Sequence, residues 1–404
     1  MVILMRDDEL ETMRKSFNTV KNRSDNIKDS PSTIKLKKKV TEIKKNSIEN
    51  IDFLISQAVD SLKNNDIEVF LAKNSDEAIK YILDLSSHYD SKVIAKSKSN
   101  TLNEINLKKN LIDYGFEIVE TDLGDRILQL KNTDNKPVHP TGPASHLNLS
   151  KITGIVNKSL NVNVSQNPNE IMEVIKKDVL NRIKYADIGI SGCNAIASEE
   201  GSIIMVHNEG NISLVSLKDL HIIVAGIDKI VPELEDAISL VKLETIFATG
   251  NYVTSYINII SGPSKTADIE KKLLKNMYGA EKVVVILLDN GRSIAYPECN
   301  YCIGCGNCII HCPVYNAVGN EFGFNNYLGG RGVAISKFIE DDKTSFESGL
   351  YMCTLCGLCT LNCPVSIPTN EILENMRNVS AEKGFYPKAH EKIKKNISKN
   401  NSPY

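Results

Sequence analysis

The chain has 404 residues, of which 42% are apolar and 24% are charged, and its formal net charge is −2. These values are ordinary for a globular protein with two or three cores, and they exclude nucleic-acid binding driven by overall charge. No stretch approaches about 18 uninterrupted apolar residues, so the sequence predicts no membrane-spanning helix. The N-terminus lacks the apolar segment of a signal peptide, and ten cysteines in clustered spacing indicate a reducing, cytoplasmic setting.

Residues 1–65 are predicted to form a polar arm followed by an amphipathic helix. The arm, to about residue 33, carries scattered charges and is expected to be mobile or loosely helical. From Lys35, apolar residues recur at helical spacing as far as Leu62, with several lysines between them. A lysine-rich face is typical of a solvated helix, but it also suits a lipid or partner surface, so peripheral membrane contact stays open.

Residues 66–296 alternate between short apolar runs and helical patterns. Strands are expected at 67–72, 92–96, 116–121, 187–190, 221–225 and 283–289, and helices at 75–88, 100–114, 170–185 and 233–249. Segments 202–206 and 212–216 are expected to form a hairpin. This alternation predicts an α/β domain with a helix-covered, largely parallel sheet.

Ligands of such sheets bind beyond the carboxyl ends of the strands, where several polar residues are expected. Lys96 and Lys98 alternate with serines and are candidates for binding an anion, although lysines at a strand edge are ordinarily solvated. His139 and His146 are candidates for acid–base chemistry, or they brace a proline-rich loop. Further candidates stand in turn-like segments: Glu199 and Glu209 for catalysis, and Asn194 and Asn208 for substrate binding.

Eight of the ten cysteines form two matching runs, each of which ends in Cys-Pro. The spacing C-x-x-C-x-x-C-x-x-x-C-P is that of bacterial ferredoxins, in which the fourth cysteine of one run ligates the other cluster. The sequence therefore predicts two [4Fe–4S] clusters. The expected ligands are Cys302, Cys305, Cys308 and Cys363 for the first cluster, and Cys353, Cys356, Cys359 and Cys312 for the second.

Structural zinc is the competing interpretation, but it ordinarily uses two separated C-x-x-C pairs. Cys193 lies outside the runs and is expected to be a small buried residue rather than a nucleophile. Cys299 would allow a register of Cys299, Cys302 and Cys305, but the closing C-x-x-x-C-P is met only from Cys308, which excludes that register. About 40 residues separate the runs, so residues 297–380 are expected to form a mainly α-helical two-cluster domain rather than a small β-rich ferredoxin. The lysine-rich tail, residues 381–404, is expected to be frayed.

Further motifs precede the cysteine runs: Lys96-Ser-Lys-Ser99, Glu120-Thr-Asp-Leu-Gly124, His139 to His146, Gly189-Ile-Ser-Gly-Cys-Asn194 with Glu199 and Gly201, Asn208-Glu-Gly-Asn211, Ser261-Gly-Pro263 and Leu288-Asp-Asn-Gly-Arg292. With the cysteine runs, these motifs resemble the lactate utilisation protein B family, in which a LUD domain precedes a two-cluster ferredoxin. The resemblance covers about residues 67–372, or roughly three-quarters of the chain. In the family pattern we expect Ala where this chain has Cys193, Thr where it has Glu200, and often a longer C-terminal region.

The resemblance implies an electron-transfer subunit of an L-lactate-oxidising complex, assembled with a cysteine-rich CCG-domain subunit and a separate LUD-domain subunit. It also implies a fold similar to the sugar-phosphate isomerase and CoA-transferase type. One alternative is that the LUD domain itself binds or transforms a small organic acid or thioester. Another is a heterodisulfide-reductase-like subunit of sulfur metabolism. No Gly-x-Gly-x-x-Gly flavin fingerprint follows a predicted strand.

Overall fold

The computed structural model describes residues 5–132 and 136–403, and its centre is a six-stranded parallel sheet. The strand order is β1-β12-β7-β4-β2-β3, and every neighbouring pair is parallel. The long central strands are almost continuously apolar, as expected for a sheet that is covered on both faces. The strands are β1 (Ile67–Ala72), β2 (Val93–Lys96), β3 (Glu117–Glu120), β4 (Ile188–Ser191), β7 (Leu220–Gly226) and β12 (Lys282–Leu288).

Alternate residues of these strands are buried under different helices. Ile94 and Ile118 face one layer, whereas their neighbours Ala95 and Val119 face the other, as the two-residue period of a strand requires. The first layer contains α4 (Ser75–Ser87), α5 (Asn100–Glu104) and α6 (Leu107–Asp113). The second contains α3 (Ile51–Asn64), α7 (Leu123–Lys131), α8 (Leu149–Leu160), α9 (Pro168–Ile183) and α10 (Asn211–Ser216). The predicted helix-covered parallel sheet is thus confirmed.

A smaller four-stranded sheet packs against the second face, in the order β8-β5-β6-β9. The predicted hairpin of segments 202–206 and 212–216 is wrong. Segment Ser202–His207 pairs instead with β5 and β9, and Asn211–Ser216 is helix α10. The strands are β5 (Ala195–Ala197), β6 (Ser202–His207), β8 (Ile230–Val231) and β9 (Tyr256–Ile260); β10 (Lys265–Thr266) and β11 (Leu274–Lys275) form a separate projecting hairpin.

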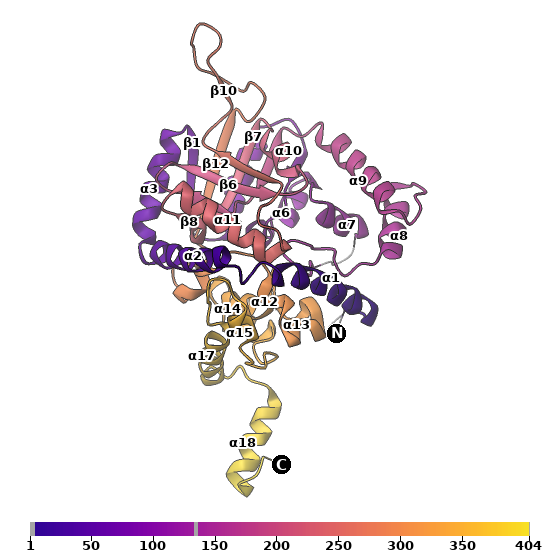
Figure 1. The fold of residues 1–404 in the computed structure, drawn as a ribbon, viewed down its shortest axis with the longest axis vertical. Coiled ribbons are helices and arrows are strands. Elements are labelled where there is room, and N and C mark those ends of the chain that lie inside the picture. The colour runs from indigo at the N-terminus through magenta and orange to yellow at the C-terminus, as the bar shows by residue number, and fades with distance from the viewer. Residues whose placement is uncertain (1–4, 133–135, 404) are drawn as a thin grey trace.

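The cysteine runs lie in a mainly helical module beneath the sheets (Figure 1). Its two longest helices, α14 (Gly329–Ile339) and α17 (Thr369–Glu382), pack against each other. The shorter elements are η2 (Pro297–Tyr301), α12 (Asn307–Ile310), α13 (Pro313–Val318), η3 (Gly319–Glu321), β13 (Gly323–Phe324), β14 (Tyr327–Leu328), α15 (Asp342–Glu347) and α16 (Leu358–Leu361).

Helices α1 (Asp7–Asp25) and α2 (Pro31–Glu49) lie between the sheets and the cysteine module (Figure 1). Both contact α11 (Leu234–Thr249), while α1 also contacts α12 and α13 and α2 contacts η2. The described part of the predicted arm is therefore not loose: Leu10, Met13 and Phe17 are buried in a core that continues into the cysteine module. The first four residues of the arm lie outside the described residues.

The tail also differs from the expectation, since Lys388–Asn400 forms helix α18. This helix projects from the body, and none of its residues is buried (Figure 1). None of the helices within residues 5–132 and 136–403 combines the length and apolarity needed to cross a bilayer.

Candidate functional site

A cavity of about 420 Å³ opens at the carboxyl ends of β2, β3 and β4. Strands β2 and β4 are neighbours in the sheet. From β2 the chain continues to β3, at the near edge of the sheet, whereas from β4 it continues to β7, in the opposite direction, so the strand order reverses between β2 and β4. Such a switch point is the usual ligand site of parallel α/β sheets. Gly192 allows the two loops to approach closely, because a Cβ there would lie 2.3 Å from Oγ of Ser99.

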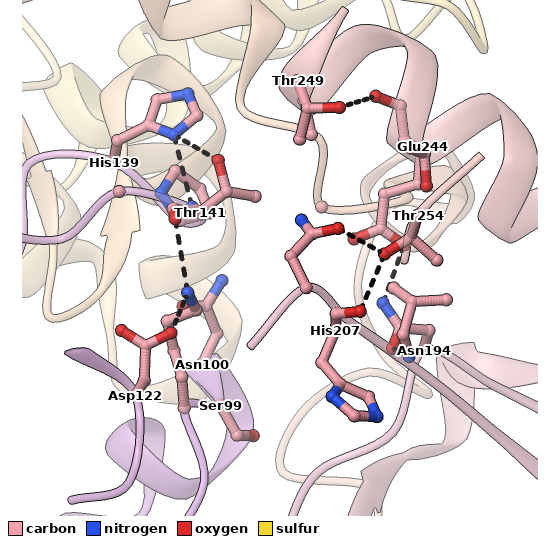
Figure 2. Close-up of a pocket in the computed structure, with 18 of the residues that line it drawn as sticks. Ser99, Asn100, Asp122, His139, Thr141, Asn194, His207, Glu244, Thr249 and Thr254 are labelled. Atoms are coloured by element: carbon pink, nitrogen blue, oxygen red, sulfur yellow. Dashed lines mark hydrogen bonds and ion pairs between the residues drawn. The ribbon is translucent and has the colours of Figure 1, made fainter. Parts of the chain in front are cut away.

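One wall of the cavity combines a lysine, an aspartate and a histidine (Figure 2). Nζ of Lys98 lies 2.7 Å from Oδ2 of Asp122 and 3.3 Å from the Thr141 carbonyl oxygen. The buried His139 ring accepts a hydrogen bond at Nδ1 from the Thr141 amide, at 3.3 Å. An accepting Nδ1 places the ring proton of neutral His139 on Nε2. Burial, followed by repulsion from Lys98, lowers the pKa of His139 to about 3.

The opposite wall is built from the second sheet and α11 (Figure 2). Asn194 donates from Nδ2 to Oε2 of Glu244 at 2.9 Å and accepts from the Val206 amide at 3.0 Å, so its orientation is fixed. Asn208 accepts from Oγ1 of Thr254 at 3.0 Å. Burial raises the pKa of Glu244, with Lys229 acting in the opposite direction.

The back of the cavity belongs to the first cysteine run, through Ile303 and Gly304. A Cβ on Gly304 would lie 3.7 Å from Oε1 of Glu244, and a Cβ on Gly306 would lie 2.6 Å from Nε2 of His139. Both walls of the cavity therefore reach the first cysteine run.

Carboxylates outnumber lysines in the first wall and in the buried layer behind it. Lys96 is buried and pairs with Glu120 at 2.9 Å, and Lys98 is already paired with Asp122. Burial, followed by repulsion from Glu120, raises the pKa of the nearby Asp125 to about 7. Burial and Asp122 also raise the pKa of Glu209. An added anion would meet these carboxylates, so the wall is poorly suited to anion binding.

We expect Asp125→Asn to flatten the pH dependence of stability. Asp125 titrates near pH 7 in the folded chain and near its ordinary value of 3.8 when unfolded, so between these values the folded state holds more protons. The free energy of unfolding of the natural chain therefore falls as pH rises from about 4 to 7, by up to about 1.4 kcal/mol per pH unit for one proton. Denaturant unfolding at pH 5, 6, 7 and 8 measures the pH dependence of the free energy of unfolding for the natural chain and for Asp125→Asn. Equal slopes in the two proteins would contradict the assignment.

The thiols of the two runs gather in two sets. Burial raises the pKa of Cys305, and its neighbouring thiols, in decreasing order of effect, are Cys308, Cys363 and Cys302. Cys312, from the first run, has the second-run thiols Cys359 and Cys353 as its neighbours, and Cys356 adjoins both of these. The fourth thiol of each run thus lies with the first three of the other run.

The surroundings of these thiols fit cubane clusters. Gly304, Gly306 and Gly357 have φ of 81°, 75° and 73°, values that residues with a Cβ rarely adopt. The second set lines a small hollow together with Cys308, Arg331 and Gly357. Cys308 neighbours both sets, so two clusters held there would be adjacent. We keep the ligand assignment made from the spacing as a proposal, and this grouping supports it.

The two remaining cysteines lie outside both sets. Burial raises the pKa of Cys193 to about 12 and that of Cys299 to about 11. Cys193 lines the cavity and Cys299 packs in the core below the first run. Both are therefore neutral thiols at neutral pH.

The candidate residues from the sequence divide between the cavity and the rest of the domain. His139, Glu209, Lys98, Asn194 and Asn208 line the cavity. His146 is buried elsewhere, Glu199 is exposed, and Lys96 is covered, so none of these three is among the lining residues. The sequence candidates omitted five charged or imidazole-bearing lining residues: Arg23, Asp122, His207, Lys229 and Glu244.

The fold and the site together define a LUD-domain protein with a fused two-cluster ferredoxin module. Residues 55–288 match the LUD domain, and residues 298–367 match the 4Fe-4S dicluster domain. The chain accordingly carries two [4Fe–4S] clusters.

Bacterial proteins called lactate utilization protein B are similar to this chain over most of its length. Those of Lysinibacillus sphaericus, Geobacillus kaustophilus and Geobacillus thermodenitrificans are each 35% identical to this chain, over 84%, 85% and 85% of it and 71% of their own length. The chain belongs to the lactate utilization protein B family. A solved DUF162 family protein from Deinococcus radiodurans aligns with 59% of this chain and 98% of its own, at 12% identity and a TM-score of 0.32.

Proposed function

We propose that the chain is the iron–sulfur electron-transfer subunit of an L-lactate-oxidising complex in the cytoplasm. The observation that supports this most directly is the order of the parts. The cavity adjoins Ile303 and Gly304 of the first run, Cys308 neighbours both thiol sets, and Cys356 of the second set is exposed. Two adjacent clusters in these positions would connect the cavity with the surface, where a partner can exchange electrons.

The relay suits a reaction that releases two electrons. Oxidation of lactate to pyruvate yields two electrons and two protons, and each cubane accepts one electron at a time. The proposed partners are a CCG-domain subunit and a separate LUD-domain subunit, and the names of the relatives support the connection with lactate.

Anaerobic affinity purification from the native cells tests the subunit assignment. We expect a CCG-domain protein and a second LUD-domain protein to accompany the chain when lactate is the carbon source. Recovery of a thiol–disulfide enzyme in place of these two would favour the sulfur-metabolism alternative. Recovery of the chain without companions, under conditions that preserve its clusters, would contradict the complex.

The cavity supports a second candidate function, in which the LUD domain itself binds a small organic acid. Lys229 and Arg23 line the cavity, and neither takes part in an ion pair within the described part of the chain. Both are available to a carboxylate, unlike Lys98. A carboxylate bound by either of them would share the cavity with Ile303 and Gly304 of the first cysteine run.

Lys229→Gln is expected to weaken binding of L-lactate or pyruvate to the isolated chain. Loss of one charge-assisted hydrogen bond, about 1.5–3 kcal/mol, corresponds to a roughly 10- to 100-fold rise in Kd. Isothermal titration calorimetry measures this, with Lys282→Gln as the control because Lys282 pairs with Glu68 away from the cavity. Equal affinities in both variants, or no binding by the natural chain, would count against the second function.

A further inference from the structure

A group of buried charges joins the α/β domain to the cysteine module. Arg292 donates to both carboxylate oxygens of Glu104, at 2.7 and 2.9 Å, and its Nε donates to Asp228 at 2.6 Å. The Tyr327 hydroxyl, from β14, also donates to Glu104. Glu104, Asp228 and Arg292 are each no more than 5% exposed.

Two further cations lie at the edge of this group. Lys44 from α2 is buried and donates to the Asp228 carbonyl oxygen. Arg331 from α14 donates from Nη2 to the Cys299 carbonyl oxygen at 3.1 Å, and its guanidinium lies 5.0 Å from the centre of the Tyr327 ring. The group therefore holds three cations and two carboxylates.

One positive charge in this group is not balanced by a carboxylate of the group. Burying an unpaired charge in a protein is costly unless an opposite charge lies nearby. Moreover, Nε and Nη1 of Arg331 are buried and lack hydrogen-bond partners among the described residues, although guanidinium donors are rarely left unused.

The excess charge lies beside the first thiol set. Cys302 is the strongest electrostatic neighbour of Arg331: burial alone would lower the pKa of the guanidinium, but Cys302, Tyr327 and Cys299 raise it. Cys302 also raises the pKa of Lys44, against the larger effect of burial, which lowers it. A [4Fe–4S] cluster with four thiolates carries net negative charge, and N–H donors and cations near it raise its reduction potential.

Arg331 also lines the hollow of the second thiol set, but the thiols that act most strongly on its guanidinium are Cys302 and Cys299. The second set has a cation of its own, with fewer unused donors. Burial raises the pKa of Cys353 and Arg377 lowers it. The Nε and Nη2 of Arg377 both donate to the Leu350 carbonyl oxygen, at 3.1 and 3.0 Å, and Nη2 also donates to the Cys353 carbonyl oxygen. No guanidinium donor of Arg377 is among the buried unpartnered atoms in the part of the chain that the structure describes.

We propose that Arg331, supported by Lys44, holds the first cluster through its unused N–H donors and its charge, and sets the reduction potential of that cluster above that of the second. The proposal rests on the crossed ligand assignment and is independent of which substrate supplies the electrons. It makes the cluster beside the cavity the first to be reduced, so that the first electron to enter the chain resides there.

An EPR-monitored redox titration of the anaerobically reconstituted full chain tests this. Arg331→Gln should lower the one-electron equilibrium constant for reduction of the first cluster at least tenfold. The higher midpoint potential should therefore fall by about 59 mV or more, while the lower midpoint potential should not change. Arg331→Lys keeps the charge and should shift less. Arg377→Gln, the matched control, should leave the higher potential unchanged.

The Cys312→Ala protein, which should retain the first cluster, shows which midpoint belongs to that cluster. If Arg331→Gln fails to load iron fully, Lys44→Met takes its place in the titration. Its higher midpoint potential should fall in the same way, but by less. The proposal would be overturned if fully loaded Arg331→Gln kept both midpoint potentials of the natural chain. If Arg331→Gln does not load, unchanged midpoint potentials in Lys44→Met would overturn it. So would a shift that falls on the second cluster.

Discussion

Cys363→Ala is expected to remove the cluster beside the cavity, although Cys363 lies in the other cysteine run. The thiol of Cys363 neighbours Cys305 and Cys308, and it completes their set. With one cubane lost, iron in the anaerobically reconstituted chain should fall from about eight to about four atoms per chain. Colorimetric iron analysis measures this, and Cys193→Ala, which removes a thiol outside both sets, should keep all eight.

The spectra of four variants test the crossed arrangement itself. Cys363→Ala and Cys305→Ala should leave the same cluster and hence the same EPR spectrum after reduction. Cys312→Ala and Cys356→Ala should leave the other. If each run instead held its own cluster, Cys312→Ala would match Cys305→Ala, and the assignment would be wrong.

Arg292→Met is expected to produce a large loss of stability. The change leaves the buried carboxylates of Glu104 and Asp228 without their shared partner. Breaking a buried pair in this way costs about 3–5 kcal/mol, which corresponds to a fall in Tm of about 6–20 °C for a domain of this size.

Thermal unfolding followed by circular dichroism, at matched iron content, measures the change. Lys272→Met is the control, because the pair of Lys272 with Glu270 at 2.9 Å is exposed on both sides, and its Tm should not change measurably. A Tm of Arg292→Met within about 2 °C of the natural value would show that the buried network contributes little to the fold.

The sequence predicts those parts of the fold that depend on neighbouring residues, such as apolar strands and closely spaced cluster ligands. Apolar runs such as Lys282–Leu288 predict covered parallel strands, because only a strand buried on both faces tolerates so continuous an apolar sequence. The cysteine spacing likewise predicts two clusters, since the ligand geometry of a cubane determines the spacing.

Long-range packing explains the predictions that differ from the structure. Leu10, Met13 and Phe17 have helical spacing, but the surface that covers them is built from distant segments, including Phe247 and Tyr315. Segment Asn211–Ser216 mixes three apolar with three polar residues, and so short a pattern does not distinguish a strand from a helix without its tertiary partners.

The cavity could be predicted only in part for the same reason. Lys96 and Lys98 were expected on one side of a strand, but β2 ends at Lys96, so alternation does not continue and only Lys98 reaches the cavity. Glu244 lies in the middle of α11 and Lys229 at the end of a short helical turn, η1 (Ile227–Lys229), and neither stands in a recognisable motif. Only the fold brings these two to the first cysteine run.

The central claim, that the chain relays electrons from lactate oxidation, is tested most directly by adding L-lactate to the anaerobic, cluster-loaded protein together with its co-purified partners. The clusters should be reduced, with the first cluster ahead of the second, as visible bleaching and EPR signals report. If L-lactate reduced the clusters of the chain without its partners, lactate would be oxidised in the cavity of this chain. Clusters that dithionite reduces but that L-lactate leaves oxidised, even with all partners present, would contradict the account.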